Sequence, residues 1–364
     1  MALPFLNGSL RKKRNQIMAI DLGGRTTKAV MLERRGEVLA LTRYALLDAP
    51  ISDKRISTDT LTGHLRSVAE AMGDATKSVA LSIGPDDALV KQVELPQIPI
   101  GEMRQLFKMN ARNILQQDLP NYVYDCYVFP PREGLPGKAG EKKAEFSKQP
   151  VLPKLKVLVA ASKQQLIADY QMAVRNAGLT AESIVPALIG PLNAFEMALP
   201  QVFQNESVAL VDIGFKHSTI CLLDRGELVL SRGVNIGGDR LTAGLAETMN
   251  ISYAEAEGIK VGLAPEAQSA LESQVMPLGR ELRASIDFFE HQQDRAVSQV
   301  YVCGAAARSE MFLEMLRAEM IVECKTWNPT TFLQLALPGQ QTMEIEQVGP
   351  QLSVAIGVAV ASLE

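Results

Sequence analysis

The sequence predicts an α/β protein built from two related lobes, and three observations lead to this prediction. Two distant segments, beginning at Ile17 and Val208, share the order apolar strand, Asp-x-Gly, polar turn and second apolar strand. Both continue through Arg-Gly-Glu, at 35–37 and 225–227, into a third strand. Strand-like and helix-like patterns alternate along the rest of the chain. The length of 364 residues suits two lobes better than one compact core.

The first copy and the segments after it predict a regular series of elements. Three strands come first, because Gly-bearing polar turns separate the apolar runs. A helix is expected over 57–73, where apolar residues recur at helical spacing, Ser or Thr caps the start and Gly73 ends it. Further strands are expected at 78–84, 87–96 and 123–130, and a helix over 100–117. The Gly-, Pro- and Lys-rich stretch 131–154 predicts an exposed loop.

The same criteria predict the elements of the remaining chain. A strand at 155–161 and helices over 162–178 and 186–199 precede the second copy. After its strands we expect the helices 239–250, 252–262, 266–295 and 308–320, with a strand at 298–305. The final helix, 351–364, is rich in Ala and Gly, and we interpret it as packed in the core rather than spanning a membrane.

Composition narrows the function classes. Hydrophobic residues make up 47% of the chain and charged residues 21%, as in an ordinary globular protein. A formal net charge of −4 gives no support for nucleic-acid binding. The four cysteines are scattered without a C-x-x-C pair, so neither a zinc site nor a disulfide framework is indicated, and a reducing cytoplasm fits. Of the three histidines, His64 and His291 are expected at solvated helix positions and His217 in the second turn, none with a catalytic role.

The segment 1–16 does not have the layout of a signal peptide, because its basic cluster follows the weakly apolar part. We interpret it as a basic, flexible, solvated tail. The alternative is a basic segment that rests on an anionic membrane surface.

The two Asp-x-Gly turns predict a binding site for a polyphosphate. Glycine permits a close backbone approach, and successive N–H groups at such a turn form a nest for anions. In the first copy the candidate phosphate-binding residues are Gly23, Gly24, Arg25, Thr26, Thr27 and Lys28. In the second copy they are Gly214, Lys216, Ser218 and Thr219, with Phe215 and His217 between them. Asp21 and Asp212 are the candidate ligands of a hydrated Mg²⁺ ion. The alternative is that each turn is merely a tight hairpin.

This layout resembles the actin-like ATPase superfamily, which has two phosphate loops, an adenosine motif and two connecting helices. In place of the usual glycine-rich adenosine motif, "VYVCGAAARSEMF" carries Gly304, Ala305, Ala306 and Arg308. The segment "AEAEGIK" resembles the one that places Glu257 and Lys260 by the ribose and base, and Gly237 and Gly238 match the glycine pair of the second lobe. The last helix, with Ala355 and Gly357, is similar to the second connecting helix, where small residues allow the lobes to hinge.

Within that superfamily the chain resembles the PilM family of type IV pilus assembly proteins, which is related to the division protein FtsA. The similar phrases are "IDLGGRTTKAVML", "VELPQIPIGEMRQLFKMNARNILQQDLP", "VLVAASKQQLIADYQMAVRNAGL" and "NIGGDRLTAGLAETMNISYAEAEGIKVG". The resemblance implies a duplicated actin-like, ribonuclease H-like fold with a subdomain inserted in the first lobe. The expected parts are the tail 1–16, the first-lobe core 17–87, the insert 88–180, a connecting helix 181–207, the second lobe 208–345 and the C-terminal connecting helix 346–364.

The resemblance implies a cytoplasmic adaptor that binds ATP and Mg²⁺ and is peripheral to the inner membrane through a partner. That partner is a PilN-like membrane protein, whose N-terminal cytoplasmic peptide lies in a groove between the first lobe's core and its insert. Other proteins of the pilus platform are possible further partners. Asn193 is expected near the γ-phosphate. An amide orients water but accepts no proton, so at most weak ATPase activity is predicted. The alternative for Asn193 is a packing or capping role.

Other functions remain open at this point. An FtsA-like filament or division protein would carry an amphipathic membrane-targeting tail, which is not seen after the final apolar segment. A small-molecule kinase needs a carboxylate base beside its substrate, and none is found. Because Arg25, Phe215 and His217 are bulky, a degenerate scaffold that does not hydrolyse nucleotide is a further alternative.

Overall fold

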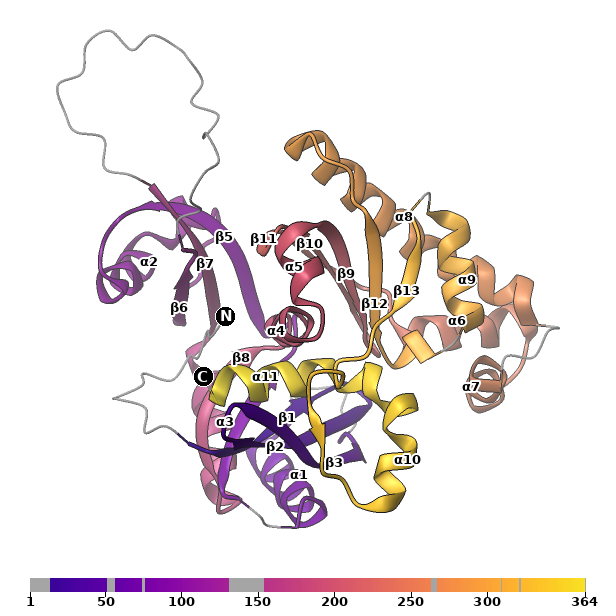
Figure 1. Cartoon of the computed structure of the whole chain (residues 1–364), viewed down its shortest axis with the longest axis horizontal. Coiled ribbons are helices and arrows are strands. Elements are labelled where there is room, and N and C mark those ends of the chain that lie inside the picture. Colours follow the sequence, from indigo (N-terminus) through magenta and orange to yellow (C-terminus); the bar gives the residue numbers. More distant parts are fainter. Residues whose placement is uncertain are drawn as a thin grey trace, which may run out of the picture.

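The computed structural model describes residues 14–50, 56–73, 76–130, 154–262, 267–308, 310–320 and 322–363. Two lobes lie side by side, and a smaller three-stranded unit stands against one side of them (Figure 1). The lobes carry sheets of six and five strands. Most of the expected tail 1–16 and nearly all of the expected loop 131–154 lie outside the described residues.

The first lobe is a mixed sheet in the order β14-β3-β2-β1-β4-β8. Its strands are β1 (Gln16–Leu22), β2 (Thr26–Arg35), β3 (Val38–Asp48), β4 (Ser78–Ile83), β8 (Thr180–Pro186) and β14 (Gln334–Leu335). The first three form the predicted antiparallel meander, and β4 and β8 join in parallel. β4 is buried along its whole length, as its apolar run requires of a central parallel strand.

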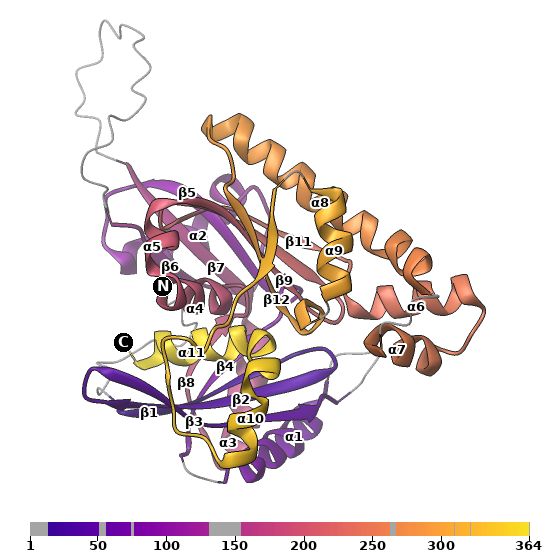
Figure 2. The same ribbon diagram turned by 45° about the vertical axis from the view of Figure 1, so that its right-hand side comes forward.

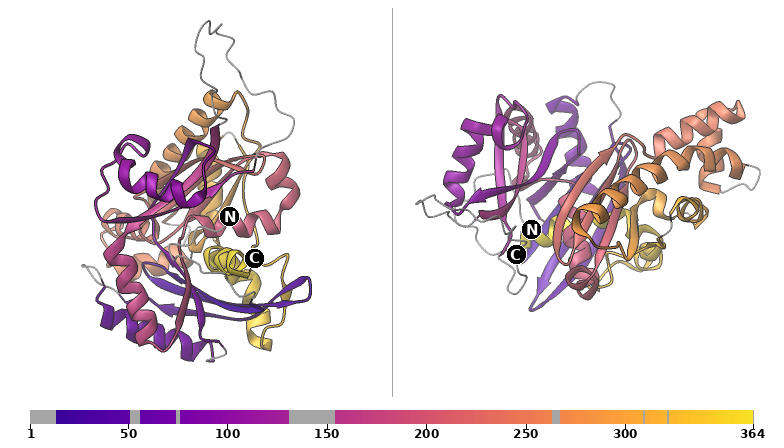
Figure 3. Two further views of the ribbon diagram at one scale, coloured as in Figure 1. Left: turned by 90° about the vertical axis from the view of Figure 1, so that its left-hand side faces the viewer. Right: turned by 90° about the horizontal axis from the view of Figure 1, so that it is seen from above.

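Helices cover both faces of this sheet. α1 (Thr58–Ala71) and α3 (Gln164–Asn176) lie on one face and α11 (Ser353–Leu363) on the other (Figure 3). The predicted caps of α1 are confirmed. The backbone N–H of Thr60 donates to Ser57 Oγ at 3.1 Å, and Gly73 leaves the helix with a φ of +72°.

The second lobe repeats this layout, which confirms the predicted duplication. Its sheet has the order β11-β10-β9-β12-β13, again an antiparallel meander followed by two parallel strands. The strands are β9 (Ser207–Ile213), β10 (Ser218–Asp224), β11 (Glu227–Val234), β12 (Gln299–Gly304) and β13 (Cys324–Thr326). The helices are α6 (Gly238–Met249), α7 (Tyr253–Gly262), α8 (Gln268–Gln293), the short η2 (Ala305–Arg308) and α9 (Glu310–Glu319). α8 and α9 pack against this sheet (Figure 2).

The inserted unit is a three-stranded antiparallel sheet with one helix, and it ends earlier than predicted. It comprises β5 (Ala88–Pro96), α2 (Ile100–Ile114), β6 (Tyr122–Val128) and β7 (Lys154–Lys163), in the sheet order β5-β7-β6. The predicted boundary at 180 is wrong, because β8 pairs with β4 and α3 packs against α1. Because α3 packs on α1 and β8 of the first lobe, the insert ends at Lys163.

Two helices connect the lobes. α4 (Ile189–Ala198) continues into α5 (Pro200–Asn205) and packs against α11. A Cβ on Gly357 would collide with the carbonyl of Gly190, so these helices touch backbone to backbone at small residues.

The chain returns to the first lobe before the predicted boundary at 345, which is therefore also wrong. β14 pairs with β3, and Gln341 on α10 (Gly339–Val348) donates to the backbone carbonyl of Tyr44 at 2.8 Å. Leu333 and Ile345 are buried in the first-lobe core, which holds this segment there. The short η3 (Gly349–Leu352) then leads into α11.

All four cysteines are buried free thiols. Within the described ranges, no helix combines the length and apolar character needed to cross a bilayer.

Candidate functional site

Each lobe carries an aspartate near the end of its first strand, directly before a sharp turn. Lys28 stands opposite Asp21 in the β1–β2 register, and its Nζ lies 2.9 Å from Asp21 Oδ2. Ser82 on β4, a polar residue in an apolar run, donates to Asp21 Oδ1 at 2.7 Å. In the second lobe Thr219 stands opposite Asp212. Directly opposite residues of an antiparallel pair share a face, so Lys28 and Thr219 lie on the same face as their aspartates.

Glycine is required in both turns. A Cβ on Gly23 would lie 2.5 Å from the carbonyl oxygen of Thr26, and one on Gly214 would lie 2.8 Å from that of His217. Neither approach is tolerated by a real side chain, so a larger residue would force the turn open. The two Asp-x-Gly motifs therefore make the same kind of turn in both lobes.

The two turns face each other across the junction of the lobes. A Cβ on Gly24 would lie 3.6 Å from the ring of Phe215 and 3.8 Å from Cγ of Lys216, which is itself exposed. Burial acts to lower the pKa of Lys28, but the Asp21 carboxylate and, more weakly, Asp212 raise that pKa above its ordinary value. Two carboxylates thus act on one lysine, and this excess of negative charge suits a hydrated divalent cation.

The surroundings of Asp212 disfavour the charged form of its carboxyl group. Burial raises the pKa of its carboxyl to about 6, and Asp21 adds to the rise while Lys28 and the Cys303 thiol oppose it. Cys303 Sγ lies 3.8 Å from Asp212 Oδ1. A Cβ on Gly304, which has a φ of +92°, would lie 2.8 Å from the same oxygen. The end of β12, predicted as the start of the adenosine motif, therefore lies directly beside Asp212.

Two predicted phosphate-binding hydroxyls are turned away from the junction. Thr27 Oγ1 lies 2.7 Å from His64 Nε2, and Ser218 Oγ donates to the carbonyl of Ile236 at 2.6 Å. Both residues are fully buried, because strand alternation places them on the face opposite to their neighbours Lys28 and Thr219. The expectation that His64 is solvated is wrong: it is half-buried, and burial lowers its pKa. His291 is exposed, as predicted.

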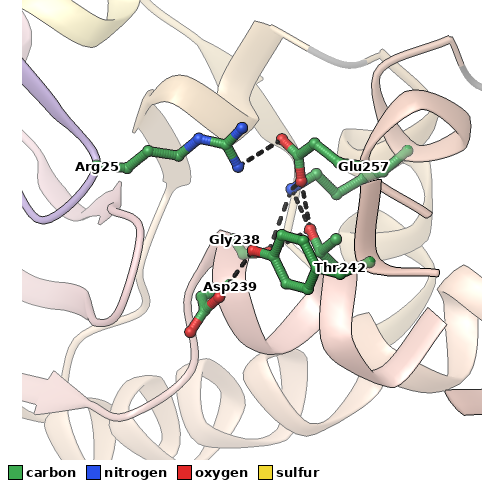
Figure 4. A network of polar contacts seen from close by, with 7 residues as sticks. Arg25, Gly238, Asp239, Thr242 and Glu257 are labelled. Carbon is green, nitrogen blue, oxygen red and sulfur yellow. Dashed lines mark hydrogen bonds and ion pairs between the residues drawn. The ribbon is translucent and has the colours of Figure 1, made fainter. Parts of the chain in front are cut away.

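The second lobe brings Gly238 of the predicted glycine pair close to Glu257, one of the predicted ribose-binding residues (Figure 4). The N–H of Gly238 donates to the carbonyl of Gly214 at 3.0 Å, which ties the start of α6 to the second turn directly after Gly237. Lys260 Nζ donates to the Gly238 carbonyl at 3.2 Å and to Glu257 Oε2 at 2.7 Å.

Thr242, one helical turn after Gly238, completes this network and was missed by sequence reasoning. Its Oγ1 lies 2.5 Å from Glu257 Oε2 and 2.6 Å from Lys260 Nζ. Burial alone would raise the pKa of Glu257, but the bonds from Lys260 and Thr242 and the charge of Arg25 lower it. Tyr253 donates to Asp239 at 2.7 Å on the same side of the network.

Four further predicted residues lie on η2 and α4. Ala305 is exposed and Ala306 half-buried on η2, while the side chain of Arg308 lies outside the described structure. Asn193 is buried between α4 and α11, and its amide donates to the carbonyl of Gly357 at 3.3 Å. Its predicted role in orienting water is not tested by this contact, which matches the packing alternative.

A hollow of about 360 Å³ lies where the first-lobe core, the insert and strand β11 of the second lobe meet. The residues that line it come from the β4–β5 turn, the ends of β6 and β7, the segment after β8 and strand β11; they include Gly84, Asp86, Tyr122, Lys163, Pro186 and Arg232. Asp86 Oδ2 lies 2.7 Å from His217 Nε2 of the second turn. The insert also touches the second lobe through Glu227, which pairs with Lys156 at 2.6 Å.

Comparison with known proteins identifies similar sequences and folds. The family model of the type IV pilus assembly protein PilM matches residues 146–363, more than half of the chain. The solved "PilM-PilN type IV pilus biogenesis complex" superposes with a TM-score of 0.81 at 19% identity, over 97% of this chain and 100% of that chain. This superposition agrees with the predicted two-lobe, actin-like fold.

The cell division protein FtsA is similar over smaller shares. FtsA of Bacillus subtilis is 31% identical over 103 residues, which cover 28% of this chain and 22% of that protein. FtsA of Streptococcus pneumoniae is 19% identical over 312 residues, which cover 83% of this chain and 66% of that protein. The matched region thus spans less than two thirds of either relative. The family match, by contrast, runs from the end of the insert to the last described helix, and the chain belongs to the type IV pilus assembly protein PilM family.

Proposed function

We propose that this chain is an ATP-binding adaptor of the inner-membrane assembly platform of a type IV pilus or a related secretion system. In this role it binds the N-terminal cytoplasmic peptide of a PilN-like membrane protein and reaches the membrane from the cytoplasm through that partner. The observation that carries the proposal is the hollow beside the first-lobe core and the insert, closed on a third side by β11, in a chain of the PilM family whose fold superposes on a PilM–PilN complex.

The hollow suits a short peptide segment. A volume of about 360 Å³ accommodates a few side chains, at the lower end of the range for ligand sites. Its apolar lining includes Leu89, Leu119 and Pro186. Charged residues of both signs line it, with Asp86 on the β4–β5 turn, Lys163 on β7 and Arg232 on β11. An extended peptide can therefore bury apolar side chains against the apolar lining and place polar groups beside the charged residues.

A hollow-filling variant tests the peptide site. Gly84 lines the hollow, and a Cβ on it would meet no atom within 4 Å. Gly84→Trp is therefore expected to fold and to occupy the space that the peptide needs. The matched control is Gly63→Trp on the exposed side of α1, where a Cβ also meets no atom within 4 Å.

The measurement is calorimetric titration with a synthetic peptide from the N-terminus of a neighbouring PilN-like protein. Wild type and Gly63→Trp are expected to bind equally, and Gly84→Trp to lose at least about tenfold in affinity, which corresponds to about 1.4 kcal/mol. Equal binding of the peptide and a scrambled version by wild type would refute the adaptor proposal.

The residues at the junction of the turns fit a magnesium-bound nucleoside triphosphate. Asp21 and Asp212 would hold the hydrated ion, which neutralises phosphate charge when bound. The N–H groups around Gly23 and Gly214, with Lys28, Thr26 and Thr219, would face the phosphates. Glu257 and Lys260 would lie by the ribose and base, and the turn after Gly304 would lie by the adenine.

We expect hydrolysis to be slow. Asn193 cannot accept a proton at neutral pH, and its amide is bonded to the carbonyl of Gly357 between two helices. An ATP-binding switch or scaffold fits these residues better than a rapid enzyme does.

Calorimetry with ATP and Mg²⁺ tests the nucleotide site. Asp21→Ala and Asp212→Ala are each expected to weaken binding about tenfold or more, because each removes a charged ligand. The control, Asp287→Ala on the exposed side of α8, is expected to bind like wild type. A wild-type protein that gives no heat with ATP or ADP would overturn the nucleotide proposal and leave a nucleotide-free scaffold.

A further inference from the structure

Arg25 extends from the first lobe to the second. It stands in the β1–β2 turn, and its Nη1 lies 3.2 Å from Glu257 Oε1 on α7 (Figure 4). Its guanidinium carbon lies 5.6 Å from the ring centre of Phe215 in the second turn. One side chain therefore makes both an ion pair and a cation–π contact with the opposite lobe.

The two oxygens of Glu257 have separate partners. Oε2 receives Lys260 and Thr242, both from the second lobe, at 2.7 and 2.5 Å. Oε1 faces the first lobe and receives Arg25. The carboxylate is thus held in place by its own lobe, and its remaining oxygen is bonded to a residue of the other lobe.

This position places Arg25 in competition with a nucleoside. A ribose hydroxyl or a base amino group that uses Glu257 is a hydrogen-bond donor, as the guanidinium is. Both need Oε1, because Oε2 is already occupied. A nucleoside without phosphate gives Arg25 no anion to bind when it leaves Glu257. A triphosphate provides such an anion, because the guanidinium binds phosphate oxygens in a bidentate manner.

We propose that Arg25 is a specificity-determining residue that makes nucleotide binding depend on phosphate: it bonds Glu257 in the nucleotide-free chain and is released only when phosphate groups accept it. This inference rests on the proposed nucleotide site. It accounts for a bulky cation in a turn whose other residues are small. It also makes Arg25 a contact that holds the lobes together before nucleotide binds.

The test compares wild type with Arg25→Ala. The matched control is Arg35→Ala, because Arg35 stands at the end of β2, has 45% of its side chain exposed against 43% for Arg25, and pairs within its own hairpin. Dissociation constants for adenosine and for ATP with Mg²⁺ are measured by calorimetry. Hydrogen exchange of the turns and of α7 is measured without nucleotide.

Loss of the Glu257 contact is expected to tighten adenosine binding about two- to fivefold, since an exposed ion pair contributes little. Loss of the phosphate contact is expected to weaken ATP binding about tenfold. The preference for ATP over adenosine should therefore fall by about twenty- to fiftyfold in Arg25→Ala and stay unchanged in Arg35→Ala. Exchange in the turns and α7 of nucleotide-free Arg25→Ala should be faster than in wild type.

An unchanged preference together with unchanged exchange overturns the inference and leaves the proposed function standing. Absence of ATP binding by wild type overturns both. Arg25→Lys separates charge from geometry: it keeps the cation but loses the planar fork, so the preference should recover only in part. Full recovery with lysine would refute the proposal that bidentate binding to phosphate releases Arg25 from Glu257.

Discussion

Neutralising Asp212 should stabilise the nucleotide-free protein, although it damages the site. The carboxyl has an ordinary pKa of 3.8 and a pKa of about 6 in the folded chain, chiefly because burial disfavours its charged form. At neutral pH the folded protein therefore carries a charge that it holds less favourably than the unfolded chain does. Asp212→Asn keeps the shape of the side chain and removes this cost.

The pKa shift of Asp212 determines the size and sign of the change in stability that Asp212→Asn causes. A rise of about two pKa units corresponds to about 3 kcal/mol. This is the largest increase in the free energy of unfolding that Asp212→Asn can give at pH 8. Because the folded pKa is raised, the folded state takes up a proton first, and the wild type regains stability as the pH falls from about 7 toward 4. At pH 5 the carboxyl is largely protonated in the folded state, so about half of the gain from Asp212→Asn should remain.

Thermal unfolding with a metal chelator present, at pH 8 and at pH 5, measures this gain. An increase in Tm of up to about 6 °C is expected at pH 8, at about 2 °C per kcal/mol for a protein of this size, with a clearly smaller increase at pH 5. The control Asp21→Asn should lower Tm, because Asp21 accepts a bond from Ser82 and pairs with Lys28. A loss of stability in Asp212→Asn at pH 8, or a gain that does not change with pH, would refute the reasoning.

Three further predictions concern the lobes and the insert. Gly357→Ala should lower the free energy of unfolding by about 1–3 kcal/mol in urea titrations, because its methyl group would collide with α4, whereas Gly258→Ala on exposed α7 should not. Cys126 and Cys324, whose pKa values burial raises to about 11, should react with a thiol reagent in the native state only slowly below pH 9, and fast reaction would contradict their burial. Glu227→Gln should speed hydrogen exchange in β5, because it loses the ion pair to a lysine of β7, and unchanged exchange would argue that this contact does not hold the insert.

Local patterns were sufficient to predict the duplicated design. The repeat of Asp-x-Gly between apolar strands requires the same turn in both lobes, since Gly23 and Gly214 each have a carbonyl where a Cβ would be. Helical spacing and caps likewise predicted α1 with both of its ends. These features depend on contacts within a few residues, which a sequence displays directly.

Contacts between distant segments were decided only by the tertiary structure. Strand alternation turns Thr27 and Ser218 toward the lobe interiors, although both carry hydroxyls next to a predicted phosphate-binding turn. The insert ended at Lys163 and the chain returned to the first lobe by β14, because α3 and Leu333 are buried in the first-lobe core. Neither boundary has a local signal in the sequence.

The contact of Arg25 with the second lobe is the clearest example of a contact that only the tertiary structure decides. The sequence by itself determined that a bulky cation stands in the first turn, and that an acid and a lysine stand three residues apart in α7. Only the tertiary structure decided that this cation meets Glu257, because more than two hundred residues of chain separate them and the packing of the two lobes sets their distance. Local sequence determines a turn or a helix, but a contact between lobes depends on how every intervening element packs.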